Sequence, residues 1–88
     1  MISIQIILPD GTVYHEKADE IKILLEDGWM GIREKHSPLI AKLADGEVQI
    51  TYQQTKKTYR LTEAFFRILE NEALILTETC DNNPVPLS

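Results

Sequence analysis

Regular alternation of apolar and polar residues opens the chain. In the segment MISIQIIL every second side chain is apolar and lies on one face of an extended strand: Ile2, Ile4, Ile6 and Leu8. Pro9-Asp10-Gly11 then favours a turn. Residues 12–16 are expected to return beside the first strand, so the chain should begin with a β-hairpin.

Two more strands are predicted around a turn at Glu26-Asp27-Gly28. Residues 21–25 (IKILL) resemble a buried strand, and residues 29–32 follow the turn as a short segment. Ser37 precedes Pro38 and is therefore extended, because proline disfavours the helical conformation in the residue before it. We expect another strand to follow over residues 39–43.

The strongest short hairpin signal in the chain is Asp45-Gly46. It should turn the chain into a strand over residues 47–53, which alternates regularly. Val48, Ile50 and Tyr52 are expected to point inward and the polar residues between them outward. This pattern is typical of a half-buried strand.

Residues 61–79 allow two interpretations. A helix is one, because four apolar residues fall at helical spacing and Thr62 could cap them: Leu61, Phe65, Ile68 and Leu69. Two strands are the other, because Glu70-Asn71-Glu72 divides the stretch into two apolar pieces of strand length. We predict the two strands, joined by a turn.

Eight to ten short strands and no helix predict an all-β fold. We expect two antiparallel sheets packed as a β-sandwich or a flattened barrel. Residues 1–80 should form this domain, because a chain of 88 residues has no room for a second one. Residues 81–88 contain two prolines, which cannot continue a ladder, so we expect a flexible tail.

Composition argues against several classes of function. The formal net charge is −5 and the basic residues are dispersed, so a nucleic-acid backbone would be repelled. Apolar runs are a few residues long, whereas a membrane-spanning helix needs about 20. The first residues lack the pattern of a signal peptide, and the single cysteine, Cys80, fits a reducing compartment. We expect the chain in the cytosol unless a partner holds it at a membrane.

Catalytic chemistry finds little support in the residues. His36 and Ser37 are adjacent, and adjacent side chains of an extended segment point apart, so they do not predict a nucleophile and its base. Glu34 and His36 could share a strand face as metal ligands do, but no second ligand pair has a recognisable spacing. His15 is expected on a solvent face. We therefore predict no catalytic residue, no metal and no cofactor.

The only tryptophan stands in an unusual place, in the sequence Gly28-Trp29-Met30-Gly31. Glycine frees the backbone on both sides, so we expect a bend that displays the two large residues. They could instead close one end of the core, as large apolar residues usually do. Trp, Met and the nearby Arg33 are types enriched at interfaces, which favours a contact surface. The sequence leaves both interpretations open.

The segment DGWMGIREKHSPLIAKLADGEVQI resembles the pattern GxxGIxxxHxPLL…xxGxVxI of the N-terminal domain of the epsilon subunit of F-type ATP synthases. The matching residues are Gly28, Gly31, Ile32, His36, Pro38, Leu39, Ile40, Gly46, Val48 and Ile50. A later stretch over residues 65–78 resembles xFFxIxxNxAxILTE of the same family. The likeness extends over residues 1 to about 80.

This resemblance implies a two-sheet β-sandwich at the foot of the central stalk. It implies gamma and the c ring as partners, the gamma subunit on one side and the polar loops of the ring at one end. Trp29, Met30, Arg33 and His36 would then form the rim that contacts the c ring. Gly28, Gly31, Ile32, Pro38, Leu39 and Gly46 would be structural residues of the motif.

Some positions depart from the family pattern. Thr62-Glu63-Ala64-Phe65 stands where the family usually has SGGF, and Glu34-Lys35 stands where it often has Pro-Gly. We interpret the chain as a divergent member or as part of a variant synthase. The family also continues into a C-terminal helical hairpin that can inhibit hydrolysis, whereas this sequence ends at Ser88. If that is the natural length, we expect coupling and assembly without hairpin inhibition.

Three functions follow in order of preference. The first is a non-catalytic stalk subunit, monomeric when isolated and peripheral on the cytoplasmic face of the membrane. The second is a free-standing β-sandwich adaptor that binds an unrelated protein through the rim over residues 29–36. The third, a small hydrolase or metal enzyme centred on His36, has the least support.

Overall fold

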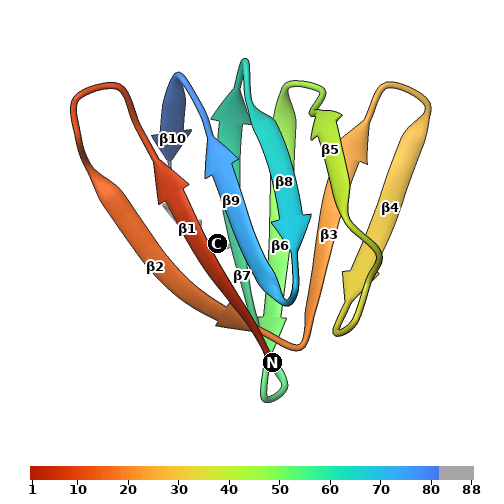
Figure 1. Cartoon of the computed structure of the whole chain (residues 1–88). Helices are drawn as coiled ribbons and strands as arrows, with labels where there is room; N and C mark the ends of the chain where they lie inside the picture. The colour runs from red at the N-terminus through yellow and green to blue at the C-terminus, as the bar shows by residue number, and fades with distance from the viewer. Residues whose placement is uncertain (82–88) are drawn as a thin grey trace.

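The computed structural model describes residues 1–81, which form ten strands and no helix (Figure 1). The strands are β1 (Ile2–Ile7), β2 (Val13–Ala18), β3 (Glu20–Leu25), β4 (Gly28–Arg33), β5 (Leu39–Lys42), β6 (Gly46–Tyr52), β7 (Thr55–Thr62), β8 (Phe65–Leu69), β9 (Glu72–Leu76) and β10 (Thr79–Asp81). The predicted all-β fold is confirmed, and so are the two strands predicted within residues 61–79. Residues 1–81 contain no helix long and apolar enough to cross a membrane.

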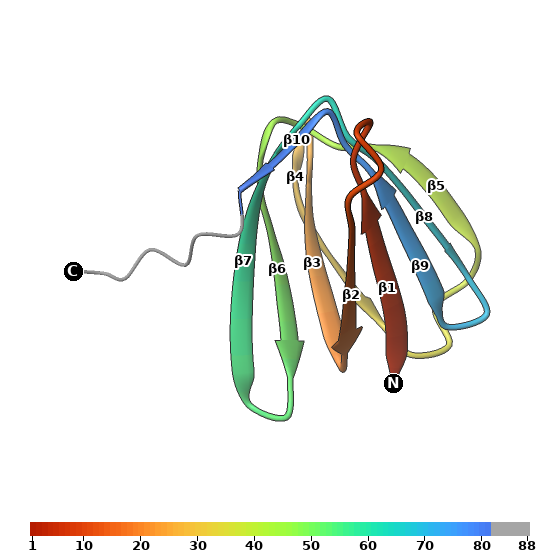
Figure 2. The ribbon, with the colours of Figure 1, turned by 90° about the vertical axis from the view of Figure 1, so that its left-hand side faces the viewer.

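The strands form two five-stranded sheets that pack as two layers (Figure 2). Sheet A has the order β2-β1-β9-β8-β5, and sheet B has the order β10-β7-β6-β3-β4. Neighbouring strands are antiparallel except β1 and β9, which run parallel. A parallel pair needs a long connection between its strands, and here everything from β2 to β8 lies between the two.

Inward-facing side chains of both sheets fill the space between them. On β1, β3, β6, β7, β8 and β9 the buried residues are two apart, as the pleat requires, and β1 contributes Ile2, Ile4 and Ile6. Phe66 of β8 is the largest fully buried side chain. In β6 the predicted inward residues Val48 and Ile50 are buried, whereas Tyr52, at the end of the strand, is half-buried. This common core ties the two sheets into one unit.

The predicted hairpin at Asp45-Gly46 is wrong. The strand before it, β5, pairs with β8 in sheet A, whereas β6 pairs with β3 and β7 in sheet B. The connection therefore crosses between the sheets, and the backbone N–H of Glu63 donates to Oδ1 of Asp45 at 2.9 Å. A turn signal is local, but the pairing of β5 is decided by a strand more than 20 residues further along the chain.

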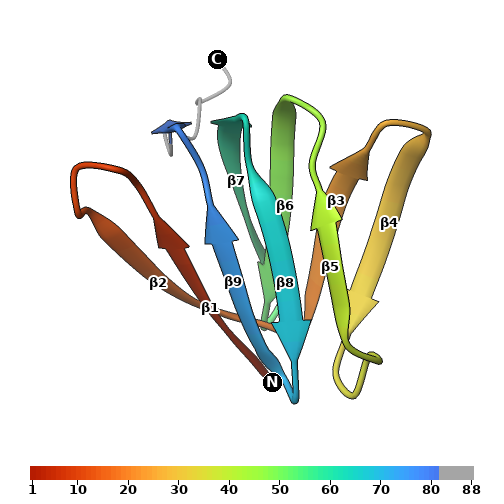
Figure 3. The same cartoon turned by 45° about the horizontal axis from the view of Figure 1, so that its top comes forward.

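All connections gather at two ends of the sandwich (Figures 1 and 3). We call the end made by residues 8–12, 26–27, 43–45, 63–64 and 77–78 the upper end, as it is drawn in Figure 1. The lower end consists of Met1 and residues 19, 34–38, 53–54 and 70–71. Six exposed carboxylates lie on the upper end: Asp10, Glu26, Asp27, Asp45, Glu63 and Glu78.

The predicted tail starts at Asp81, the last residue that the structure describes. Asp81 is the last residue of β10 and pairs with Arg60 on β7, because β7 offers its free edge to a short added strand. The rest of that prediction, residues 82–88, lies outside the described residues. The boundary of the domain stays a prediction.

Candidate interaction surfaces

Trp29 and Met30, the first two predicted rim residues, lie on β4. Neighbouring side chains of a strand point to opposite faces of the sheet. Trp29 points away from the sandwich and is 49% exposed. Met30 points inward and packs against the core. The expected bend is wrong, since both residues lie within a regular strand that pairs with β3. Met30 therefore fits the core interpretation, whereas Trp29 is exposed and its role as a contact residue stays a prediction.

The other two rim residues lie toward the opposite end of the sandwich. Trp29 pairs with Leu24 beside the upper end, whereas Arg33 is the last residue of β4 and His36 follows in the lower end. Four residues of strand place Trp29 and Arg33 about 13 Å apart along the strand. The structure does not gather the four predicted residues into one rim.

Hydrogen bonds and ion pairs hold the lower end together. Nε of Arg33 lies 3.4 Å from Oε2 of Glu20, and the amino group of Met1 pairs with Glu34. The backbone N–H of Lys35 donates to Oδ1 of Asn71 at 2.7 Å. These contacts join the connection after β4 to its neighbours, so they serve structure.

His36 does not contact the hydroxyl of Ser37. Its Nδ1 lies 2.7 Å from the backbone oxygen of Ser37, and because a carbonyl only accepts, Nδ1 carries the proton in this contact. Within residues 1–81 no group of three or more His, Cys, Asp or Glu side chains is placed to hold a metal ion.

The motif residues occupy structural positions around β4 and β6. Ile32 is fully buried, and Leu39 packs partly against the core, while Pro38 is exposed. Gly46 opens β6 with a φ of +146°, and a Cβ there would lie 2.9 Å from Cδ2 of Leu24. Gly28 opens β4, and a Cβ on Gly31 would lie 3.1 Å from Oε2 of Glu20.

The outer face of sheet A carries a group of exposed apolar residues that was not predicted from the sequence. Strand pairing places four apolar residues side by side across four strands: Val13, Ile7, Leu76 and Phe65. Phe65 is 50% exposed and Leu76 is 47% exposed. Leu69, Leu74 and Ile40 extend this surface toward the lower end. We call the outer face of sheet A the apolar face.

The outer face of sheet B is different. Its exposed or half-buried residues are mostly charged or hydroxyl-bearing, and Leu24 and Trp29 are the large apolar exceptions. Scattered apolar residues are ordinary on a protein surface, whereas a contiguous patch points to an interaction site. The two faces therefore differ in chemical character, and the outer face of sheet A is the candidate interaction site.

A signal for the apolar face is present in the sequence. In FFRIL and EALIL apolar residues follow one another directly, so both faces of β8 and β9 are apolar. Such strands are expected where both faces of a sheet become covered. Their assembly with β1 and β2 depends on pairing that the sequence pattern does not reveal.

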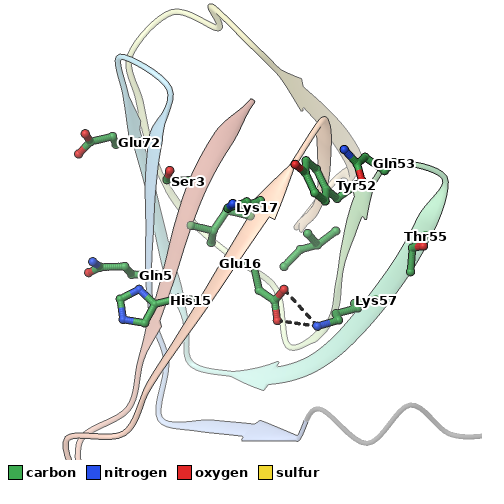
Figure 4. Close-up of a pocket in the computed structure, with 12 residues that line it drawn as sticks. Ser3, Gln5, His15, Glu16, Lys17, Tyr52, Gln53, Thr55, Lys57 and Glu72 are labelled. Atoms are coloured by element: carbon green, nitrogen blue, oxygen red, sulfur yellow. Dashed lines mark hydrogen bonds and ion pairs between the residues drawn. The ribbon is translucent and has the colours of Figure 1, made fainter.

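A polar cluster joins the two sheets at one open side of the sandwich. Glu16 of β2 forms an ion pair with Nζ of Lys57 at 3.2 Å (Figure 4). It also accepts a hydrogen bond from the hydroxyl of Tyr59, which lies on β7 like Lys57. Beside it lies a pocket of about 790 Å³ whose lining includes the buried Ile4 and Ile50. Because Glu16 is already engaged by two donors, we interpret the cluster as a clamp between sheets.

Burial, together with the hydrogen bond to Glu16 and its charge, raises the pKa of Tyr59 above its ordinary value. Burial, with the charge of Asp81, raises the pKa of Cys80 to about 11. A raised pKa keeps the phenol and the thiol protonated at neutral pH. Neither is therefore activated as a nucleophile.

The sequence model described as "ATP synthase, Delta/Epsilon chain, beta-sandwich domain" matches residues 1–83. The chain belongs to this family. The predicted resemblance is confirmed, and the match includes every described strand.

Relatives in the delta/epsilon family are longer than this chain. The ATP synthase epsilon chain of Pediococcus pentosaceus is 32% identical over 85 residues, which are 93% of this chain and 60% of the relative. That of Koribacter versatilis is 31% identical over 77 residues, 88% of this chain and 54% of the relative. The chain thus spans somewhat over half the length of these epsilon chains.

Solved structures share the fold of this family member. A chain of the Tetrahymena thermophila mitochondrial ATP synthase, in a structure of its central stalk and c ring, superposes with a TM-score of 0.76 at 12% identity, covering 92% of this chain and 66% of the other. A chain of the Euglena gracilis mitochondrial ATP synthase gives 0.74 at 24% identity, covering 92% and 55%. At these identities the likeness establishes the fold alone.

Proposed function

We propose that the chain is a non-catalytic subunit in the central stalk of an F-type ATP synthase. In this proposal the gamma subunit packs on the apolar face, and the c ring meets the upper end. The observation that carries it is the contiguous apolar face of sheet A in a chain whose residues 1–83 match the delta/epsilon family. An apolar surface of this kind is stabilised when a partner removes it from water.

A stalk subunit must transmit torque without deforming, and the sandwich suits this role. Its core is shared by both sheets, and the contact between Glu16 and Tyr59 ties the edge strand of one sheet to the other. Close-packed interiors have low compressibility and transmit strain. The proposed role is mechanical, because torque would be transmitted from the c ring through this chain to gamma.

Contact with the c ring is assigned to the Trp29 side of the molecule. Trp29 lies between two motif glycines, is exposed beside the upper end, and belongs to a residue type enriched among those that dominate interfaces. Met30 would support it from the core. Arg33 and His36, toward the other end of the sandwich, would not reach the same ring surface.

The proposed location is the cytoplasmic face of the membrane, with the chain held peripherally by gamma and the c ring. The upper end, which would face the membrane in this proposal, carries six exposed carboxylates and is therefore poorly suited to insertion in lipid. Anionic groups are repelled by the negative surface of the cytoplasmic leaflet. Attachment through protein partners therefore fits better than attachment to lipid.

Co-purification tests this function. The chain, tagged, is expressed with the gamma subunit and c ring of the same organism, and the expected result is a complex that contains all three. A standard interface with gamma would bury about 1,600 Å² in total. Leu76→Ser should weaken capture of gamma, whereas Thr58→Ser on the outer face of sheet B should not. No capture of gamma by the unaltered chain would contradict the proposal, and capture of an unrelated protein through Trp29 would favour the adaptor.

A further inference from the structure

Arg67 lies within the apolar face and has no charged partner there. Its direct cross-strand neighbours are Leu74 on β9 and Ile40 on β5. Ile40 is 76% exposed, the largest value among the large apolar side chains of residues 1–81. Within residues 1–81 the guanidinium of Arg67 forms no ion pair and no hydrogen bond.

The other two arginines of the chain have a carboxylate opposite them. On the outer face of sheet B, Arg33 pairs with Glu20 at 3.4 Å and Arg60 pairs with Glu47 at 3.3 Å. In both cases the two residues are direct partners across neighbouring strands. Arg67 occupies the equivalent position on sheet A with Leu74 in place of a glutamate, so its exposed charge is available to another molecule.

The rest of the apolar face does not neutralise this charge. Its cations are Lys17, Lys42 and Arg67, and its one carboxylate, Glu72, lies opposite Leu69. Nζ of Lys42 lies 5.1 Å from the centre of the Phe65 ring, at the end of the apolar row. This face is therefore cationic in a chain whose formal net charge is −5.

We infer that the surface of gamma that covers the apolar face presents a carboxylate to Arg67, with apolar side chains around it. The inference rests on the proposed function. A guanidinium that is covered without an acceptor loses its hydration and gains nothing in return, so an apolar partner alone would bind poorly. Arginine matches a carboxylate with two parallel hydrogen bonds, which fixes the register of the two surfaces as well as their affinity.

The same charges argue against a second copy of this chain as the occupant. A symmetric dimer through the apolar face would bring Lys17, Lys42 and Arg67 of one copy toward those of the other. Like charges brought together at an interface are unfavourable. An acidic and apolar surface on a different subunit satisfies both features of the face.

Binding of purified gamma from the same organism tests the inference, with folding of each variant checked by circular dichroism. Arg67→Glu should weaken the affinity roughly tenfold or more, because it places two carboxylates together. Lys56→Glu, the same change of charge on the outer face of sheet B, should leave the affinity within about twofold. Lys56 is a matched control because it also lacks an ion pair within residues 1–81.

Arg67→Met tests whether the group of gamma that faces Arg67 is a carboxylate or an apolar side chain. A partner carboxylate would be left without its arginine, so the expected result is weaker binding that depends less on salt. Equal or tighter binding of Arg67→Met would overturn the inference and leave the proposed function standing. Equal loss with Lys56→Glu would also overturn it, since the effect would then reflect total charge. If gamma does not bind the unaltered chain, the proposed function and the inference both fall.

Discussion

Tyr59 donates its hydroxyl hydrogen bond to Glu16, and this contact joins β7 of sheet B to β2 of sheet A. The ring of Tyr59 also lies 5.7 Å from that of Tyr14, measured between centroids, so one residue contributes packing and polar contact. At this open side of the two sheets, Nζ of Lys57 on β7 also pairs with Glu16. The contact is therefore well placed to resist their separation.

This arrangement predicts a loss of stability at alkaline pH. The pKa of Tyr59 is raised above its ordinary value of 10.0, so between that pH and the raised value the folded chain keeps a proton that the unfolded chain has lost. The free energy of unfolding should therefore fall as the pH rises above about 10. Tyr59→Phe should be less stable by about 1–2 kcal/mol near neutral pH, because Glu16 loses a donor, but its alkaline decline should be shallower.

Urea denaturation at about pH 8 and about pH 11 measures both effects. Cys80 contributes a decline of the same sign, from its ordinary pKa of 9.0 to about 11, and it is present in both proteins. The comparison of the two slopes therefore isolates Tyr59. Identical slopes would show that the protonated phenol is not favoured by folding.

Adjacent phenylalanines give a second prediction, because they point to opposite faces of β8. Phe66 is fully buried, and Phe66→Ala should lower the free energy of unfolding by about 3–5 kcal/mol through the cavity it leaves. A domain of this size has only several kcal/mol in total, so much of that variant should be unfolded. Phe65 is 50% exposed, and Phe65→Ala should cost about 1 kcal/mol or less.

Thermal melting of the two variants measures this difference in stability. A binding assay with gamma then tests whether Phe65 is a contact residue. Phe65→Ala should remain folded and bind gamma more weakly, since Phe65 ends the apolar row. Equal losses of stability in the two variants would mean that Phe65 also belongs to the core.

Much of the fold could be predicted from local pattern. The alternation of the first strand reveals its buried face, and Pro9-Asp10-Gly11 and Glu70-Asn71 turn the chain as expected, because such signals act within a few residues. Pairing between distant segments could not be predicted in this way. The crossover at Asp45-Gly46 and the parallel pair of β1 and β9 depend on it.

The candidate surfaces were predictable only in part, for the same reason. The resemblance placed Trp29 and His36 in one rim, but it gave no sign that a strand carries His36 to the other end of the sandwich. The apolar face needs four strands from separate parts of the chain, so no single segment shows it. The lack of a carboxylate opposite Arg67 could be recognised only from its neighbours across the sheet, Leu74 and Ile40.

Two motif glycines are expected to differ in what they tolerate. Gly46 has a φ of +146°, and an added Cβ would lie 2.9 Å from Cδ2 of Leu24, so Gly46→Ala should lower the free energy of unfolding by about 1–3 kcal/mol. Gly31 has no such φ, and its close neighbour is the flexible carboxylate of Glu20, so Gly31→Ala should change stability by about 1 kcal/mol or less. Chemical denaturation of both variants measures the difference, and equal changes would contradict it.

The separation of Trp29 from His36 predicts which end of the sandwich meets the c ring. Trp29→Ala should weaken association with the ring roughly tenfold, because an exposed tryptophan buried by a partner is a common source of binding energy. His36→Ala should leave ring binding unchanged, since His36 lies in the lower end and its ring contacts the backbone of Ser37. Both variants should keep their affinity for gamma, which the apolar face would bind. Co-sedimentation of the complex of gamma and this chain with vesicles that contain the c ring measures the effect. Loss of ring binding in His36→Ala but not in Trp29→Ala would place the ring at the lower end and reverse the proposed orientation of the sandwich.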